Sequence, residues 1–398
     1  MKAIILGAGR IGRGFVSELL INNHVEVVLF DANDELVKML NKKKEYTIHV
    51  LGDESLSTKV NNVKAYPISN VEQLAKQWEE SNVIFTACGG KNMLSVGETL
   101  GKAFRLLLDK DKVHISNIIT CENWIDPATD LKQGILETLN DEESKKVFKK
   151  NIGVSESVIL CTGTGAPDPT KVVNEMDTWV QNLWYLPIDK NRIVGDVPKW
   201  NHIEFIDNFG NLLKQKLYTN NTSVASIAFF GKLLGIERVA DAANHPNIEP
   251  LLEKIYEEIN ISLINGMGIS EKSQLEFSKK AKAKYKDYNI VDDVRRIARD
   301  PIRKLGPEDR LIGPMKMALK ANVKPRAIAL ATAAALFYQD PNDEDAIRLV
   351  KLRKTKGIDY ILTTISKLDP NEEIAQLIKA GIDELKQRGW IKDCEGDE

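Results

Sequence analysis

The sequence has few cysteines and few histidines. Its 398 residues include four cysteines and five histidines. The cysteines, Cys88, Cys121, Cys161 and Cys394, stand far apart, without the close pairs that are typical of zinc sites and of small disulfide-bonded domains. We therefore expect no metal site, and a protein of the reducing cytoplasm.

Strong charge of one sign and long apolar runs are also absent. The formal net charge is only −2, which gives no indication of nucleic acid or of an anionic membrane as the main partner. The longest apolar stretches, such as residues 327–338, fall short of the roughly 18 residues that suggest a membrane-spanning helix. The first residues lack the pattern of a signal peptide. We expect a small-molecule substrate, no nucleic-acid or membrane partner, and a monomer or homodimer.

The composition is that of an ordinary globular protein, with 43% hydrophobic and 28% charged residues. A chain of this length exceeds the size at which one hydrophobic core keeps growing, so two domains are expected. We predict an α/β fold, in which residues 1–195 form a Rossmann domain with a doubly wound sheet. Residues 196–398 are expected to form a mainly α-helical domain for substrate binding and catalysis.

Short β-rich runs alternate with helical stretches in the first half of the sequence. The expected strands are residues 2–6, 25–30, 82–87 and 114–120, and the expected helices are residues 11–21, 34–43 and 94–108. This alternation predicts a parallel sheet covered by helices. Residues 46–67 have the alternating character of an inserted hairpin. Beyond about residue 200, apolar residues recur at intervals of three and four, which predicts helices.

The candidate cofactor site begins with a G-x-G-x-x-G motif between the first expected strand and the first expected helix. Its residues are Gly7, Ala8, Gly9, Arg10, Ile11 and Gly12. Gly7 permits a tight turn, Gly9 lets the backbone approach a pyrophosphate, and Gly12 lets the helix pack closely on the strand. The helix N-terminus then offers N–H groups to the phosphates. A plain glycine-rich turn is the alternative interpretation of such a motif.

Asp31 indicates which dinucleotide this site binds. It follows the second expected strand, 19 residues after Gly12, where an acidic side chain can accept hydrogen bonds from the ribose hydroxyls. The carboxylate would repel a 2′-phosphate, and the next residues are Ala32 and Asn33 rather than an arginine. The sequence therefore predicts NAD rather than NADP.

Several longer stretches resemble one enzyme family over essentially the whole chain. They are Gly7–Gly14, Thr86–Gly89, Asn117–Asn123, Lys216–Thr222 and Asp309–Pro314. On these residues the sequence resembles the polyol-specific long-chain dehydrogenases, the mannitol dehydrogenase family. The resemblance implies a zinc-independent hydride transfer between NAD and a secondary alcohol, with a polyol phosphate similar to mannitol-1-phosphate as the first candidate substrate. It also extends the expected cofactor site to Ala87, Cys88 and Gly89.

The catalytic residues follow from the same resemblance. It implies Lys216 as the general base and Asn123 and Asn221 as the amides that stabilise the developing alkoxide. A lysine that is desolvated can have a pKa near neutrality and accept a hydroxyl proton. Without the family, Lys216 is equally typical of a solvated helix face and Asn221 of a helix cap.

Two polar features of the family are missing from this sequence. The family has a histidine three residues after the second asparagine, and this position is Val224. An Asp-Arg pair of the family falls on Leu160 and Cys161. Valine cannot donate a hydrogen bond to a substrate hydroxyl. Three possibilities therefore stay open: another group fills the role, the substrate differs and is, for example, a sugar acid, or the chain binds a dinucleotide without turnover.

A basic stretch near residue 300 is the candidate for binding a substrate anion. It contains Arg295, Arg296, Arg299, Arg303, Lys304 and Arg310. Arginine binds phosphate and carboxylate through two parallel hydrogen bonds. The alternative is a surface of ion pairs with the neighbouring acidic residues, such as Asp292 and Asp309.

Overall fold

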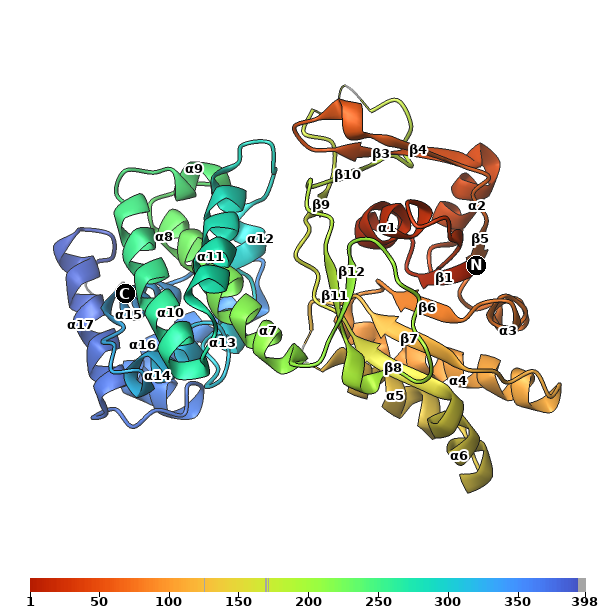
Figure 1. Cartoon of the computed structure of the whole chain (residues 1–398). Helices are drawn as coiled ribbons and strands as arrows, with labels where there is room; N and C mark the ends of the chain where they lie inside the picture. Colours follow the sequence, from red (N-terminus) through yellow and green to blue (C-terminus); the bar gives the residue numbers. More distant parts are fainter. Residues whose placement is uncertain (125, 169, 171, 393–398) are drawn as a thin grey trace. The chain divides into compact units, whose positions relative to one another are not determined.

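The computed structural model describes residues 1–124, 126–168, 170 and 172–392. It divides into two compact units, Met1–Phe209 and Gly210–Glu398 (Figure 1). The first unit contains the strands and the helices of an α/β domain, and the second is helical, so the expected fold class is confirmed.

A six-stranded parallel sheet forms the centre of the first unit. Its strands are β1 (Lys2–Leu6), β2 (Glu26–Asp31), β5 (Ala65–Pro67), β6 (Val83–Thr86), β7 (Ser116–Thr120) and β8 (Ile152–Glu156). Their order across the sheet is β5-β2-β1-β6-β7-β8. The chain builds outward from β1 to one edge and then returns to build outward from β6 to the other. The carboxyl ends of β1 and β6 therefore flank the switch point, where open α/β sheets bind ligands.

Two apolar layers cover the faces of this sheet. On one face lie α3 (Val71–Glu79), α4 (Met93–Asp109), α5 (Pro127–Thr138) and α6 (Glu142–Asn151). The other face packs against α1 (Ser17–Ile21) and α2 (Asp34–Lys43). Because both faces are buried, the central strands are apolar throughout, as β1 shows with Ala3 to Leu6 fully buried.

The expected helix over residues 11–21 begins in an unusual way. Its first part, Arg10–Val16, is a π-helix (η1), and only Ser17–Ile21 is α-helical. Neither the glycine motif nor the apolar spacing indicates this wider winding. It is one of two π-helical segments among the described residues, and both lie at expected site residues.

A smaller sheet contains the expected hairpin. Residues 45–61 form the antiparallel pair β3 (Glu45–Val50) and β4 (Thr58–Asn61), as expected. The hairpin is shorter than predicted, because Ala65–Pro67 leaves it and pairs with β2 of the main sheet as β5. On its other side β3 pairs with β10 (Thr178–Val180), which pairs with β9 (Gly163–Thr164).

The first unit extends beyond the expected boundary at residue 195. The reason is a two-stranded parallel pair, β11 (Leu186–Asp189) and β12 (Ile203–Ile206), which holds the segment up to Phe209 in this unit. These two strands are 14 residues apart in the sequence, and the segment between them lacks the apolar pattern of a helix. Hydrophobic periodicity alone therefore does not predict that they pair.

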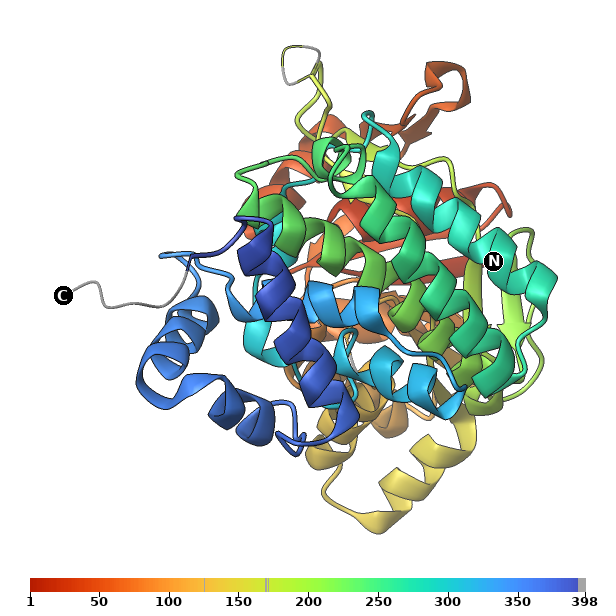
Figure 2. The same cartoon turned by 90° about the vertical axis from the view of Figure 1, so that its left-hand side faces the viewer.

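Helices make up the second unit. They are α7 (Phe209–Lys216), α8 (Thr222–Leu233), α9 (Val239–Ala243), α10 (Glu249–Met267), α11 (Glu271–Lys286), α12 (Val294–Ala298), α13 (Pro301–Lys304), α14 (Ile312–Lys320), α15 (Arg326–Leu336), α16 (Glu344–Thr364) and α17 (Glu373–Gln387). Their apolar faces form one core around α8 and α15. The last helix, α17 (dark blue in Figure 2), packs closely on α15. The two helices approach so closely at Gly381 that a Cβ there would lie 3.1 Å from Leu330 Cα. Within the described residues, no helix is long and apolar enough to cross a membrane.

Candidate active site

The glycine turn after β1 has the geometry that its sequence predicts. Gly7 has φ +99°, and a Cβ there would lie 2.4 Å from the carbonyl oxygen of Ala87. A Cβ at Gly12 would lie 1.9 Å from the carbonyl oxygen of Gly7. Open space surrounds Gly9 instead, with no atom within 4 Å of a Cβ position. Two glycines thus allow close packing inside the protein, and the third leaves the loop open to a ligand.

Asp31 lies directly against this turn. Its carboxylate accepts hydrogen bonds from the backbone N–H of Ala8 at 2.7 Å and of Asn33 at 2.8 Å. Asn33 then caps α2 by accepting from Glu35 and Leu36 N–H groups. The acidic side chain is half-buried at the carboxyl end of β2, which is the place expected for a ribose-binding carboxylate.

Arg13 fastens the turn to a distant part of the first unit. Its guanidinium donates from Nε to the carbonyl oxygen of Met176 at 2.8 Å and from Nη1 to that of Ala8. Burial lowers the pKa of Arg13. Arg10, by contrast, is exposed, and Ile11 is partly exposed. Sequence reasoning missed the role of Arg13, because its partner Met176 is 163 residues away.

The loop after β6 is held by a buried carboxylate. Glu122 accepts hydrogen bonds from the backbone N–H of Cys88 at 2.8 Å and of Gly89 at 2.9 Å, and from Thr86 Oγ1 at 3.0 Å. Burial raises the pKa of Glu122. Cys88 and Gly89, two of the three expected cofactor residues in this loop, therefore give their backbone N–H groups to Glu122. Ala87 donates to Leu6 O of β1, which keeps the loop beside the glycine turn.

Asn123 follows β7 at the same edge of the sheet. It stands between Glu122, which is bound to the neighbouring loop, and Trp124, a residue that is 47% exposed. The indole Nε1 donates to Asp130 Oδ2 at 3.1 Å, and the ring packs on Gly90, where a Cβ would lie 2.2 Å from Trp124 Cβ. The structure thus brings Asn123 to the carboxyl edge that carries the glycine turn, Asp31 and residues 87–89.

A cluster of carboxylates surrounds Arg192 at the end of β8. Arg192 Nη1 lies 2.8 Å from Glu156 Oε1 and 3.0 Å from Asp126 Oδ1, and its Nε lies 3.3 Å from Asp189 Oδ2. Burial and the hydrogen bond with Asp126 raise the pKa of Glu156 to about 8. The hydrogen bond with Glu156 lowers the pKa of Asp126 to about 2. Sequence reasoning gave these residues no role.

Lys216 is the last residue of α7 in the second unit. Burial, together with the neighbouring charges of Arg310 and Lys284, lowers the pKa of its ammonium to about 7. The side chain is only partly exposed, unlike that of Lys214 on the same helix, which is exposed. This environment differs from the solvated helix face that was the alternative for Lys216.

A π-helical turn links Lys216 to Asn221. Leu217–Asn221 (η6) winds more widely than an α-helix, and the Thr222 N–H donates to Leu217 O, five residues back. In a π-helix, residues five apart are about one turn apart, so this winding brings the Lys216 and Asn221 positions to one face. The neighbouring Asn220 has a buried side-chain oxygen without a hydrogen-bond partner in the described part of the chain. π-Helical turns of this kind are frequent at functional sites.

The three positions at which the family's polar residues are missing lie in apolar surroundings. Val224 is 6% exposed and belongs to the core around α8. Leu160 and Cys161 are buried in the first unit, and the Cys161 thiol donates to Gln181 O at 3.5 Å.

The basic stretch near residue 300 separates into two groups. Arg295 and Arg296 form ion pairs with Asp340 and Asp292, at 2.8 and 2.5 Å from their Nη2 atoms. Arg299 donates to the carbonyl oxygen of Arg296. For Arg295 and Arg296 the ion-pair interpretation is correct.

Lys304 and Arg310 form the second, buried group. Lys304 is only 3% exposed, and none of the described residues gives its ammonium a hydrogen bond or an ion pair. Burial and the charges of Arg310 and Arg303 lower its pKa to about 7. Arg310 is buried against Asp309, with Nε 2.7 Å from Asp309 Oδ1. The charge of Arg310 acts on both Lys304 and Lys216.

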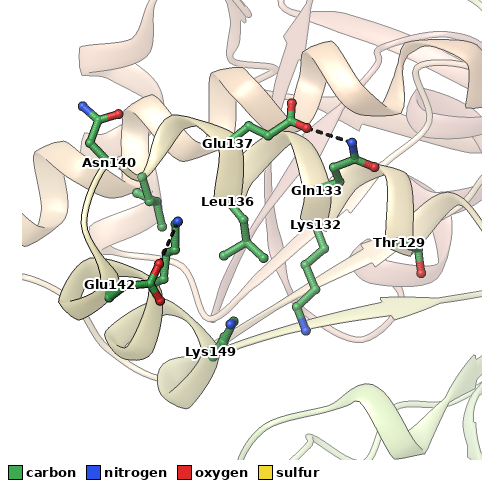
Figure 3. Close-up of a pocket in the computed structure, with 10 residues that line it drawn as sticks. Thr129, Lys132, Gln133, Leu136, Glu137, Asn140, Glu142 and Lys149 are labelled. Carbon is green, nitrogen blue, oxygen red and sulfur yellow. Dashed lines mark hydrogen bonds and ion pairs between the residues drawn. The ribbon is translucent and has the colours of Figure 1, made fainter.

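Two hollows of the first unit lie away from these residues. One, of about 710 Å³, lies between α5 and α6, and Lys132, Leu136 and Lys149 are among its lining side chains (Figure 3). The other, of about 630 Å³, lies at the amino edge of the sheet beside Met1 and Asn82. Neither contains an expected site residue. Within the described residues, no three His, Cys, Asp or Glu side chains are grouped so as to hold a metal ion.

Both units match models of one protein family. Residues 1–202 match the mannitol dehydrogenase Rossmann domain, and residues 210–386 match the mannitol dehydrogenase C-terminal domain. The chain belongs to the mannitol dehydrogenase family. The resemblance seen in the sequence is therefore confirmed.

Relatives of this mannitol dehydrogenase family member match it over nearly their whole length. The mannitol-1-phosphate 5-dehydrogenase of Bacillus pumilus (strain SAFR-032) is 31% identical over 95% of this chain and 98% of the relative. The enzyme of the same name from Bacillus subtilis (strain 168) is also 31% identical, with the same coverage. These names agree with the expected enzyme class, a dehydrogenase.

Two solved structures have the same fold as this chain. A D-sorbitol dehydrogenase in substrate-free form gives a TM-score of 0.78 at 12% identity, over 98% of this chain and 93% of the other. The Pseudomonas fluorescens mannitol 2-dehydrogenase, in a ternary complex with NAD and D-mannitol, gives 0.72 at 12% identity, over 98% and 92%.

Proposed function

We propose that the chain is an NAD-dependent dehydrogenase that interconverts a polyol phosphate and its ketose. Lys216 acts as the general base, and Asn123 and Asn221 stabilise the developing alkoxide. The observation that carries this proposal is the π-turn of the second unit, which puts a lysine of pKa about 7 and an amide on one helical face. The names of the Bacillus relatives support the substrate class.

In oxidation, the neutral amine of Lys216 takes the proton of the substrate hydroxyl. The amide N–H groups of Asn123 and Asn221 donate hydrogen bonds to the alkoxide oxygen, and they do not compete for its proton. The C–H bond at the same carbon breaks, and its hydrogen leaves with both electrons. The glycine turn and Asp31 would hold NAD, which would supply the acceptor for this hydride. A pKa near neutrality suits Lys216, because the amine must be able both to take and to return a proton.

The residues of the first unit fit NAD. The open space at Gly9 admits a pyrophosphate, and Asp31 lies next to the turn that would carry it. Asp31 is the basis for discrimination against NADP, because its carboxylate would repel a 2′-phosphate.

Replacing Asp31 with serine should therefore weaken discrimination between the two cofactors. We expect kcat/KM for NAD to fall and the NAD/NADP ratio to drop by about 10-fold or more, an effect of a kcal/mol or two. Asp31→Asn is the control, because it can still accept from the Ala8 N–H but carries no charge. Steady-state kinetics with both cofactors measures the ratio. An unchanged ratio in both variants would remove Asp31 from cofactor selection.

Lys304 and Arg310 are the proposed partners of the substrate phosphate. Lys304 is buried, and within the described residues its ammonium forms no hydrogen bond or ion pair, while Asp300 and Asp309 act on it only as more distant charges; such a charge is costly unless it is closely paired. A bound phosphate would supply the missing charge and would raise the pKa of Lys304. Arg310 can add its guanidinium, although Asp309 already engages one of its nitrogens.

A screen of substrates tests the proposed reaction. NADH formation should be fastest with a hexitol phosphate such as mannitol-1-phosphate, and slower with free hexitols and sugar acids, because only the first supplies the dianion. Absorbance at the NADH band with NAD and with NADP measures this. Faster turnover of a sugar acid would contradict the phosphate assignment and leave the dehydrogenase assignment intact.

The second candidate function is dinucleotide binding without turnover. Val224 favours it, because the family histidine is replaced by an apolar side chain inside the core of the second unit. No turnover of any polyol, polyol phosphate or sugar acid, together with tight NADH binding, would establish this alternative.

A further inference from the structure

A buried polar network borders the π-helical turn η6 of the second unit. At its centre is Gln274 of α11, which is fully buried. The side-chain oxygen of Gln274 accepts a hydrogen bond from Gln215 Nε2 at 3.0 Å. Its side-chain nitrogen lies 3.1 Å from Thr219 Oγ1, 2.9 Å from Asn260 Oδ1 and 3.1 Å from Ser278 Oγ. One amide thus joins α7, η6 and α10 to α11.

Gln274 binds the chain on both sides of Lys216. Gln215 directly precedes Lys216 at the end of α7, and Thr219 lies three residues after it, in the middle of η6. Gln215 is 5% exposed and Thr219 is fully buried, so water does not take the place of their bonds to Gln274. A buried polar group that loses its partner is costly. These bonds therefore fix the end of α7 and the wide turn against α11.

Other hydrogen bonds hold the rest of the turn. Tyr285, also of α11, donates from its hydroxyl to Asn220 O at 3.1 Å. Thr222 Oγ1, at the end of the turn, donates to Arg310 O at 2.7 Å. Because π-helical turns are rare, we infer that this winding depends on such support from the surrounding chain. Gln274 differs from the other contacts in that it binds α7 as well as η6.

We propose that Gln274 is a positioning residue, which keeps Lys216 and Asn221 on one face by holding the turn between them. This inference rests on the proposed function, which assigns proton transfer to Lys216. Gln274 itself takes no part in the reaction. Without its bonds the turn can wind differently, and the Lys216 ammonium then leaves the buried place where the charges of Arg310 and Lys284 act on it.

Gln274→Leu removes these bonds and keeps a side chain of similar volume. We expect kcat for polyol-phosphate oxidation to fall by about 10- to 100-fold, because a misplaced base transfers the proton poorly. The KM for NAD should stay unchanged, because the cofactor residues belong to the first unit. In the wild type, turnover should rise with pH around pH 7, as Lys216 loses its proton. The variant should move this midpoint up by at least about one pH unit, because a less buried ammonium keeps its proton longer.

Thr219→Val is the milder variant, and it keeps the test decisive if Gln274→Leu does not fold. Valine has the shape of threonine but lacks the hydroxyl that Gln274 binds. The midpoint should move in the same direction as in Gln274→Leu. The double variant should move it no further than Gln274→Leu alone, because both changes break the same hydrogen bond and their effects are not additive.

Thr332→Val is the matched control. Thr332 is also fully buried in the second unit, and its hydroxyl contacts Met315 of α14 and donates to Ile328 O within α15 at 2.9 Å. Its replacement removes one buried hydroxyl, as Thr219→Val does, so both variants should lower Tm. Only the Thr219 variant should move the midpoint of the pH profile. A purely structural role of the Thr219 hydroxyl would give the same profile in both.

Acetylation of Lys216 gives a readout that does not need turnover. Only the neutral amine reacts with acetic anhydride, so the pH dependence of labelling, followed by mass spectrometry, reports the pKa. We expect a midpoint around pH 7 in the wild type and one at least about one pH unit higher in Gln274→Leu. Labelling of the exposed Lys214 should be the same in both proteins.

The labelling result separates this inference from the proposed function. Equal Lys216 midpoints in the wild type and in the folded Gln274 or Thr219 variants would overturn the role of Gln274, whether or not any polyol is oxidised. A raised midpoint in these variants, together with no turnover of any polyol by the wild type, would instead reject only the proposed function.

Discussion

Replacing Lys216 with alanine is expected to lower kcat for polyol-phosphate oxidation by about 10²- to 10⁴-fold, the usual contribution of a positioned general base. The reason is the low pKa of this lysine, about 7, which makes the neutral amine available near physiological pH. NADH should still bind with unchanged affinity, because the cofactor residues belong to the first unit. Stopped-flow kinetics and fluorescence titration with NADH measure the two effects.

Lys214→Ala is the control for this experiment. Lys214 lies on the same helix, two residues before Lys216, and is exposed. Its replacement should leave kcat within about 2-fold of the wild-type value, as is usual for a surface change. Equal rates for the Lys216 variant and the wild type would eliminate Lys216 as the base.

Replacing Lys304 with methionine is expected to lower kcat/KM for a polyol phosphate by roughly 30- to 10³-fold, the usual effect of removing one partner of a buried charge pair. The free polyol should be affected little, because it has no phosphate to bind. The variant should therefore lower the ratio of kcat/KM for the polyol phosphate to kcat/KM for the free polyol. If both substrates lose activity equally, Lys304 has a general structural role and the phosphate assignment is wrong.

The same variant should be more stable than the wild type. Methionine fills a similar volume without a charge, and a buried ammonium that forms no close ion pair is unfavourable. The folded-state pKa of Lys304, about 7, lies below its ordinary value of 10.5. Between these pH values the unfolded chain binds more protons at this site, so the free energy of unfolding increases with pH.

Thermal unfolding at several pH values tests this effect. At pH 7, Tm of the Lys304→Met variant should exceed that of the wild type by a few degrees. The difference should shrink as pH approaches 10. Lys320→Met, on the exposed side of α14, should show neither effect. A lower Tm for the Lys304 variant at pH 7 would mean that the ammonium has a favourable partner.

The first unit could be predicted from sequence mainly where its signals are local. Gly7, Gly12 and Asp31 all lie within the first 31 residues. Steric space explains the two glycines and charge explains the aspartate, and both can be inferred from the neighbouring sequence. Arg13 and Glu122 were missed. Arg13 binds Met176, and Glu122 binds the loop after β6. The spacing of residues in the sequence does not predict contacts between such distant segments.

Burial decided the questions that the sequence left open in the second unit. Arg295 and Lys304 both belong to one basic stretch, yet the first pairs with Asp340 and the second is buried without an ion pair among the described residues. Residue type and spacing do not distinguish the ion-paired arginine from the buried lysine, because the environment of each residue depends on which side of its helix faces the core. Similarly, the resemblance indicated Lys216, but only the fold explains its pKa.

The wide turn between α7 and α8 has a consequence for how this part of the chain can change. One residue of α-helix corresponds to a rotation of about 100°. If residues 217–221 wound as a regular α-helix, Lys216 and Asn221, which are five residues apart, would therefore point about 140° away from each other while every side chain of the site kept its identity. The winding of this segment, and not only the identity of its side chains, keeps the two groups on one face.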